Sequence, residues 1–265
     1  MLRLALVARA ASTFPASSHA TARNADPDAV FVVSGASRGI GAEFCAQLLE
    51  RTAGTIVACC RDLSNFDVRL RGHDRVRAIE VDVADVVSVK RLGEQIDRCD
   101  VLINNAGVLH DATHRPERSV AEIDPEWLLR SFAVNAGGAV LMTQALATSL
   151  RRPAKARPTV VANLSARVGS ITDNRGWYSY RMSKSALNMA TKCLSIELKR
   201  HGTIVVSLHP GTTDTDLSAP YQRNVARDKL FDRSFTAHQL LTIIDGLEWE
   251  HTGGFFAWDG EPIEF

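Results

Sequence analysis

A tyrosine and a lysine one helical turn apart, Tyr180 and Lys184, have the residue types and spacing of an acid–base pair. Their segment has helical periodicity, so positions i and i+4 place both side chains on one face. A free tyrosine has a pKa of about 10 and is a poor base at neutral pH. A neighbouring ammonium group, joined by a second positive charge, favours the phenolate and lowers that pKa. The pair predicts proton exchange with a carbonyl or alcohol oxygen, although on its own it is also common on ordinary helix surfaces.

The segment SGASRGIG, residues 34–41, is rich in glycine where a predicted strand gives way to a predicted helix. Glycines let the backbone approach a pyrophosphate, and a helix N-terminus adds N–H groups and a positive dipole. The spacing is GxxxGxG rather than the commoner GxGxxG. We predict dinucleotide binding by Gly35, Ser37, Arg38, Gly39, Ile40 and Gly41.

Basic residues follow the second predicted strand, where an acidic residue would favour NAD. Asp or Glu at this position binds the ribose 2′-hydroxyl, whereas a cation accommodates the 2′-phosphate of NADP. Here Arg61 ends the strand, Asp62 comes one residue later, and Arg38 faces the same region from the glycine-rich turn. These cations favour NADP(H), with NAD as the alternative.

These motifs fall at the ends of strands in a chain that alternates strand and helix. Strands joined by helices require right-handed crossovers and a parallel sheet covered on both faces. Ligands bind beyond the carboxyl ends of such strands. The sequence predicts one doubly wound, Rossmann-type α/β domain over residues 26–265, with a parallel sheet of about seven strands. The expected strands are 29–35, 55–60, 76–83, 100–107, 159–165, 203–211 and 253–258, and the expected helices are 39–50, 86–96, 125–149, 178–200 and 237–249.

Composition narrows the classes of partner. The 265 residues include 31 basic and 30 acidic ones, which favours neither nucleic acid nor an anionic membrane as the main partner. The longest apolar runs have strand length, too short for a bilayer span. The five cysteines are scattered without CxxC spacing, and His110 and His114 have no carboxylate or thiol at ligand spacing. We expect reduced, mostly buried thiols and no metal site.

The first 25 residues differ from the rest of the chain. They contain Arg3, Arg9 and Arg23 and no acidic residue, since the first is Asp26. That composition is typical of an amphipathic organellar presequence and predicts a mitochondrial protein. The alternative is a disordered leader without an address on a cytoplasmic protein. Either reading places this segment outside the folded domain.

The ordered motifs GASRGIG, VDV, NNAG, VNAGG, NLSARVGS, YSYRMSK and HPGTTDTD resemble the short-chain dehydrogenase/reductase family from Ala29 to the C-terminus. The stretch around YSYRMSK and the ending GGFFAWDGEPIEF look most like the C-factor-like and sniffer-like carbonyl reductases. The resemblance implies hydride transfer between nicotinamide and a small carbonyl compound or the matching alcohol. Tyr180 would be the acid/base, and Lys184 would bind the ribose and tune Tyr180.

The resemblance also implies roles for other residues. Asn135 would bend its helix and hold a water on the proton path behind Lys184. Asp82 and Val83 would hold the adenine ring. The adjacent floor of the cofactor groove would consist of Asn105, Ala106 and Gly107. The carboxamide edge of the nicotinamide would contact Pro210, Gly211, Thr213 and Thr215. The polar segment 216–235 would cover the substrate, and the subunits would pair as a homodimer or homotetramer.

The chain departs from the family at the serine that usually orients the substrate. Counting back from Gly169, that position holds Ala166, and Ser165 precedes it. Ser165 lies 15 residues before Tyr180, farther than is usual in the family. Three alternatives follow: Ser165 takes the role, Ser170 substitutes, or the site works without the hydroxyl. The departure keeps open a different class, a dinucleotide-binding scaffold or redox sensor with impaired catalysis. A Rossmann methyltransferase would leave the Tyr/Lys pair unexplained.

Overall fold

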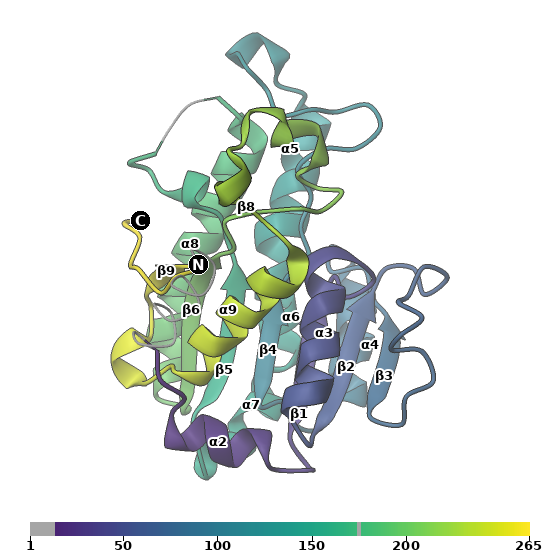
Figure 1. Ribbon diagram of the computed structural model, residues 1–265, viewed down its shortest axis with the longest axis vertical. Coiled ribbons are helices and arrows are strands. Elements are labelled where there is room, and N and C mark those ends of the chain that lie inside the picture. Colours follow the sequence, from purple (N-terminus) through teal and green to yellow (C-terminus); the bar gives the residue numbers. More distant parts are fainter. Residues whose placement is uncertain (1–13, 174–175) are drawn as a thin grey trace.

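Seven parallel strands form one sheet in the order β3-β2-β1-β4-β5-β6-β9 (Figure 1). The computed structural model describes residues 14–173 and 176–265. The predicted doubly wound, single-domain α/β fold is confirmed. The strands are β1 Val30–Ser34, β2 Thr55–Cys60, β3 Val76–Glu80, β4 Val101–Asn104, β5 Thr159–Leu164, β6 Thr203–His209 and β9 Phe255–Ala257, and a short separate ribbon pairs β7 Thr212–Thr213 with β8 Leu230–Phe231.

Helices cover both faces of the sheet because each central strand is apolar on both sides. Along β1, Phe31 and Val33 belong to one buried core and Val32 to the other. In Figure 1, α3 and α9 lie together over one face, and α4, α6 and α8 lie behind the sheet. The helices are α2 Ser18–Asn24, α3 Gly39–Arg51, α4 Val86–Gln95, α5 Pro125–Phe132, α6 Gly138–Ala145, α7 Ala147–Arg151, α8 Tyr178–Lys199 and α9 Arg233–Asp245.

The single helix predicted for residues 125–149 is wrong. A π-helical turn, Ala133–Gly137, separates α5 from α6, and α7 follows α6 after a further break at Leu146. The hydrophobic pattern is continuous through the segment, so periodicity does not reveal the break. The π turn depends instead on contacts of Asn135 with a distant loop, described below.

The last predicted helix, 237–249, also has different limits. α9 begins at Arg233 because the Asp232 side chain accepts a hydrogen bond from the Phe235 amide at 2.7 Å, a normal N-cap. It ends before Gly246, and residues Trp249–His251 form a separate 3₁₀ turn. Further 3₁₀ turns are Val120–Glu122, Pro153–Lys155, Arg167–Gly169, Ala219–Asn224 and Arg227–Lys229.

The N-terminal segment corrects the predicted domain boundary at residue 26. Residues 1–13 lie outside the described residues, but Phe14 is buried in the core and α2 packs at the amino ends of the strands (Figure 1). The Arg23 side chain is 4% exposed, and its guanidinium lies 2.6 Å from the Asp245 carboxylate at the end of α9. Residues 14–25 are therefore part of the domain, since an arginine this buried needs its partner in the fold.

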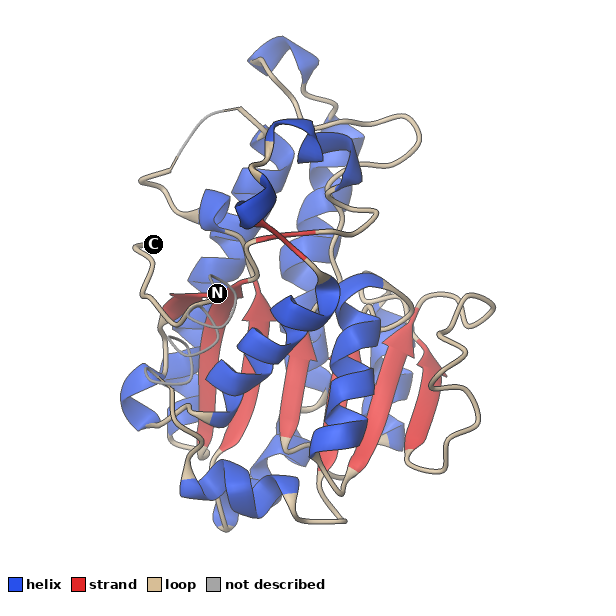
Figure 2. Ribbon diagram, in the orientation of Figure 1, coloured by secondary structure: helices blue, strands red, loops and turns tan. Residues whose placement is uncertain are grey.

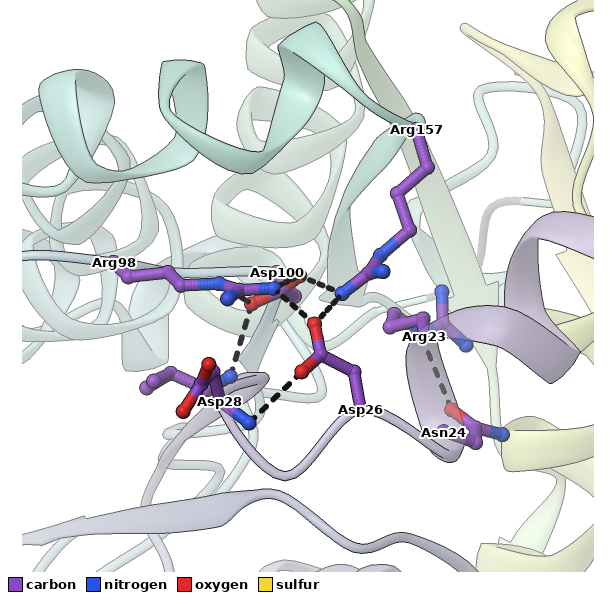
Figure 3. Close-up of polar contacts among 8 residues, drawn as sticks. Arg23, Asn24, Asp26, Asp28, Arg98, Asp100 and Arg157 are labelled. Carbon is purple, nitrogen blue, oxygen red and sulfur yellow. Dashed lines mark hydrogen bonds and ion pairs between the residues drawn. The ribbon is translucent and has the colours of Figure 1, made fainter.

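Figure 3 shows a second ion-pair cluster just after α2, in which Asp26 lies between two guanidinium groups. The Asp26 carboxylate contacts Arg98 at 2.7 Å and also contacts Arg157, and the hydrogen bond from Arg157 is the main cause that lowers the pKa of Asp26 to about 2. Both arginines also bind Asp100, whose carboxylate accepts the Val30 amide at 2.9 Å. The cluster fixes the chain's entry into β1.

None of the helices in residues 14–173 and 176–265 combines the length and apolar character needed to cross a membrane.

Candidate active site

A cavity of about 290 Å³ lies at the carboxyl ends of the strands, the end toward which the arrowheads in Figure 2 point. Its walls come from loops that follow different strands, as expected for a doubly wound sheet. Most of the predicted site residues meet here. The walls include Gly35, Ser37, Arg38, Gly39, Ile40, Arg61, Asp82, Val83, Asn105, Ala106, Gly107, Ser165, Tyr180, Lys184, Pro210 and Thr215.

The glycine-rich turn is held against the end of β4. Gly35 has φ +66°, and a Cβ on Gly41 would lie 2.1 Å from the Gly35 carbonyl oxygen, so only glycine allows this approach. The Asn105 amide donates to the Gly35 carbonyl at 3.0 Å. Gly41 therefore shapes the turn and is not part of the cavity wall. No side chain in the described residues caps α3 at Arg38, so its first-turn N–H groups are available to a phosphate.

Four arginines line the same cavity: Arg38, Arg61 and Arg233, and Arg130, described below. Arg38 forms an exposed ion pair with Asp216 at 3.2 Å, a contact that contributes little stability in water. The nearby acidic residue, Asp62, is not part of the wall, because its carboxylate accepts the Ser64 amide at 2.8 Å in its own turn. Sequence reasoning missed Arg233, which was visible only as one of several basic residues in segment 216–235.

Asp82, expected beside the adenine ring, is joined by a second missed residue. Its carboxylate accepts the Ala84 amide at 2.9 Å and lies 3.5 Å from the guanidinium of Arg130, which also lines the cavity. Arg130 lies in α5, far from Asp82 in the sequence, and no local sequence motif predicts that it reaches the cavity.

Tyr180 and Lys184 lie on α8 facing the cavity, with the Lys184 ammonium 5.7 Å from the centroid of the Tyr180 ring. The ammonium donates to the Leu164 carbonyl at 2.7 Å. Burial lowers the pKa of Lys184 to about 8. Burial also raises the pKa of the Tyr180 phenol above its usual value, which is opposite to the predicted lowering. The cause of this rise is desolvation of the phenolate.

Ser165 occupies the cavity wall with Tyr180, whereas Ala166 and Ser170 do not. The Ser165 amide extends the β5–β6 ladder by donating to the Leu208 carbonyl at 2.8 Å, and its buried hydroxyl has no hydrogen-bond partner among the described residues. The Ser170 hydroxyl is bonded to Thr172 at 2.7 Å. Of the three alternatives, the geometry favours Ser165.

The longer spacing from Ser165 to Tyr180 is taken up by the 3₁₀ turn Arg167–Gly169 and the loop after it. A Cβ on Gly169 would lie 2.8 Å from the Lys184 Cβ, so glycine lets this turn rest on α8 beside the lysine. The loop returns to α8 through Trp177, which has a left-handed φ of 57°.

Asn135 lies in the π-helical turn and binds the loop after β4. Its side chain accepts the Val108 amide at 2.7 Å and donates to the Val108 carbonyl and to the Ser183 hydroxyl, both at 2.9 Å. Gly107 lies between Asn135 and Lys184: a Cβ on it would be 3.3 Å from Asn135 Oδ1 and 3.7 Å from Lys184 Nζ. Asn135 is thus behind the cavity wall, next to the lysine.

Gly211 and Thr213 do not reach the cavity wall. Gly211 has φ +73°, and a Cβ there would lie 2.7 Å from the Phe231 ring and 2.9 Å from Trp258. Thr213 is buried and bonds the Thr236 hydroxyl at 2.9 Å. Both residues shape the segment that carries Thr215 over the glycine-rich turn, and the family pattern alone does not separate this role from cofactor contact.

Three rings, those of Trp177, Tyr221 and His110, pack in a row next to Tyr180. The Tyr221 ring packs 5.2 Å from Trp177 and 5.9 Å from His110, and Trp177 lies 6.4 Å from Tyr180, measured between ring centroids. His110 also contacts the Asp216 carbonyl at 3.3 Å, which links the loop after β4 to segment 216–235. The predicted position of this segment over the substrate side agrees with these contacts.

Comparison with known proteins agrees with this architecture. The short chain dehydrogenase family model matches residues 29–226. The C-signal protein of Myxococcus xanthus is 38% identical over 166 residues, which are 62% of this chain and 91% of that protein. Two crystal structures superpose with TM-scores of 0.80 over 91% of this chain and 100% of theirs: NADPH-bound carbonyl reductase from chicken fatty liver, at 25% identity, and carbonyl reductase Sniffer of D. melanogaster, at 26%. The chain belongs to the short-chain dehydrogenase/reductase family of oxidoreductases, which act on alcohol and carbonyl groups.

Proposed function

We propose that this protein is an NADP(H)-dependent reductase of small carbonyl compounds, or a dehydrogenase of the matching alcohols, that uses Tyr180 as its acid/base. The observation that carries the proposal is the convergence of Ser165, Tyr180 and Lys184 on one wall of a cavity whose other wall is the glycine-rich turn.

The cavity has the donor set that a dinucleotide requires. The close glycine turn and the uncapped start of α3 suit a pyrophosphate, and the Lys184 ammonium suits the ribose hydroxyls. Arg38, Arg61 and Arg233 supply cations for a 2′-phosphate. The bound nicotinamide would supply or accept the hydride. NADP(H) is also the cofactor of the similar chicken enzyme.

The side chains have complementary tasks in carbonyl reduction. The Tyr180 phenol is protonated at neutral pH and can give its proton to the carbonyl oxygen as negative charge develops there. Burial raises its pKa and so weakens it as an acid, an effect that the positive charges of Lys184 and the cofactor would oppose. The unpartnered Ser165 hydroxyl can donate a second hydrogen bond to that oxygen. Lys184, beside Asn135 and Gly107, would return a proton to the phenol after each reduction. In the reverse reaction its positive charge, with that of the cofactor, favours the phenolate form of Tyr180.

NADPH oxidation by the purified protein, measured across quinones, aldehydes and ketones, tests the proposal. Wild type should turn over at least one substrate class, and Tyr180→Phe should lower kcat by about 10²-fold while NADPH binding stays nearly intact. Tight NADPH binding without turnover on any carbonyl would select the rival, a cofactor-binding scaffold or redox sensor. Full activity of Tyr180→Phe would overturn the mechanism.

We also propose a homodimer or homotetramer that pairs through α5 and α8. These neighbouring helices expose apolar side chains, among them Phe132 at 52%, Met189 at 65% and Ile196 at 79%. Exposed apolar side chains on neighbouring helices are typical of an interface. Ile196→Glu combined with Met189→Glu should shift the sedimentation coefficient toward that of a monomer. A wild-type protein that sediments as a monomer would contradict the assembly.

We retain the mitochondrial location as a proposal, with one restriction from the fold. A processing site must precede Phe14, because Phe14 and α2 are part of the core. A fluorescent fusion of residues 1–13 that stays diffuse in the cytosol would contradict targeting by this segment and favour the cytoplasmic alternative.

A further inference from the structure

The helix that carries Tyr180 begins without a local cap. α8 starts after Trp177, which is in the left-handed conformation and makes no side-chain cap, and its first turn contains no acidic residue. The first N–H groups of a helix have no partner within the helix, and leaving them unpaired in a buried place costs stability. The partner for this turn must come from elsewhere in the chain.

That partner is Glu117, from the loop that follows β4. Its side chain is buried at 2% exposure, and its carboxylate accepts the Ser179 amide at 3.2 Å and also the Ser179 hydroxyl. Its main-chain carbonyl accepts the Trp177 amide at 2.6 Å. One residue thus pairs with two amides on either side of the start of α8, and a carboxylate suits the positive end of the helix dipole.

A second anchor lies on the other side of Tyr180. The Arg181 guanidinium donates to the Val168 carbonyl at 3.3 Å and to the Asp173 carbonyl, both in the segment after Ser165. Tyr180 therefore lies between two anchored residues. Ser179 is hydrogen-bonded to Glu117 in the loop after β4, and Arg181 is hydrogen-bonded to the segment after Ser165. The first loop carries Gly107 and Val108 into the cavity wall, and the second segment begins at Ser165.

We propose that Glu117 is a positioning residue for Tyr180. By capping α8 from the loop after β4, it fixes the phenol with respect to Ser165 and to the place where the carbonyl must lie. Glu117 is not part of the cavity wall and touches none of its residues through a described hydrogen bond, so it acts through the helix. The inference rests on the proposed function of Tyr180. A small displacement of an acid/base group is sufficient to lower kcat by on the order of 10–100-fold.

The experiment compares Glu117→Ala and Glu117→Gln, with Glu122→Gln as the control, using NADPH oxidation with the best carbonyl substrate. Glu122 lies in the same loop but is exposed, and its carboxylate accepts the Arg118 amide at 2.8 Å. Glutamine keeps an acceptor for the Ser179 amide, whereas alanine removes it. Ser179→Ala provides a milder change, because it removes one donor to Glu117 and keeps the backbone bond.

We expect Glu117→Ala to lower kcat about 10–100-fold with the Kd of NADPH within twofold of wild type, and Glu117→Gln to recover most of the activity. The solvent isotope effect on kcat should rise in Glu117→Ala, since proton transfer from a displaced phenol becomes slower, and a purely structural role would not change it. If Glu117→Ala does not fold, Ser179→Ala should still lower kcat several-fold and raise the isotope effect.

The inference would be overturned by wild-type kcat in Glu117→Ala, or, where that variant does not fold, by wild-type kcat and isotope effect in Ser179→Ala. Loss of NADPH binding in parallel with kcat would also overturn it, because the effect would then be general unfolding. Tyr180→Phe, run alongside, separates this failure from failure of the proposed function, since only the latter leaves Tyr180→Phe fully active.

Discussion

The ammonium of Lys184 donates a 2.7 Å hydrogen bond to the carbonyl of Leu164, the residue that immediately precedes Ser165. The bond joins α8 to the carboxyl end of β5 at the point where the two strongest candidates for proton chemistry meet. Lys184 is also a buried positive charge beside the cavity. Burying this charge lowers stability, whereas the charge itself supports the proposed proton transfer.

Lys184→Met should lower kcat/KM by about 10²-fold or more. It should change the free energy of unfolding little, because the variant no longer buries a charge but also loses the hydrogen bond to Leu164. The folded pKa of Lys184 is about 8 and its ordinary value 10.5, so between these values the unfolded chain binds the extra proton. Wild-type stability should therefore rise with pH across this window, and Lys184→Met should remove that component of the slope. Urea unfolding at several pH values measures it, and parallel slopes for the two proteins would contradict the burial of a charged Lys184.

Ser165→Ala should lower kcat/KM by the equivalent of about 2–4 kcal/mol, because it removes a donor aimed at the developing oxyanion. Ser170→Ala is the matched control and should retain activity, since its hydroxyl is engaged by Thr172. Ala166→Ser should give no gain. A gain there, together with an active Ser165→Ala, would return the role to position 166.

Arg61→Asp should raise the KM for NADPH by about 10–100-fold and leave the KM for NADH nearly unchanged, because a charge-assisted hydrogen bond to the 2′-phosphate is lost. Arg77→Asp, an exposed arginine on β3 outside the cavity wall, controls for the general change in charge. Equal losses with both coenzymes would show that Arg61 does not contact the phosphate.

His209 should make the protein sensitive to acid. It ends β6, its Nδ1 is buried without a hydrogen-bond partner among the described residues, and burial lowers its pKa from 6.5 to about 3. Between those values only the unfolded chain binds the proton, so stability falls as the pH drops below 6.5, by at most about 1.4 kcal/mol per pH unit. His209→Asn should reduce this loss in urea unfolding between neutral and acidic pH. The exposed His73→Asn should behave as wild type, and equal acid sensitivity of His209→Asn would contradict the assignment.

Changes in residues 14–25 should destabilise the domain. Phe14→Ala removes a buried ring and should cost about 3–5 kcal/mol, and Arg23→Ala weakens a buried ion pair of Asp245 and should cost about 3 kcal/mol. His19→Ala, exposed on the same helix, should have almost no effect. A chain beginning at Asp26 that melts at the wild-type temperature would contradict the packing of this segment.

The sequence was sufficient for the sheet and for the residues that lie directly after strands, such as Gly35, Asn105 and Ser165. Their positions follow from strand order alone, because carboxyl ends of parallel strands share one edge. Arg130 and Glu117 could not be found in this way. Each acts on a residue distant in the chain, Asp82 for one and Ser179 for the other, and nothing in the local pattern records such a pairing.

Composition misled at the N-terminus for a similar reason. Arg23 contributes to the basic character typical of a presequence. In the fold it is one of the most buried charged groups described, because it forms an ion pair with Asp245. Tertiary partners also explain Thr213, whose family motif predicts cofactor contact but whose hydroxyl is engaged by Thr236.

The π-helical turn at Ala133–Gly137 has a consequence for how this gene can change. A π turn holds one residue more than an α turn, so loss of a single codon within 133–137 would close it to regular α-helix. Asn135 would leave Val108, but the later residues of the helix would keep their facing, because closing the turn absorbs the lost residue. Gly138 would remain against Val83, where a Cβ would lie only 2.7 Å away. A deletion within the turn should therefore spare the packing of α6 and remove the contacts of Asn135, so the extra residue is inherited for the site and not for the helix.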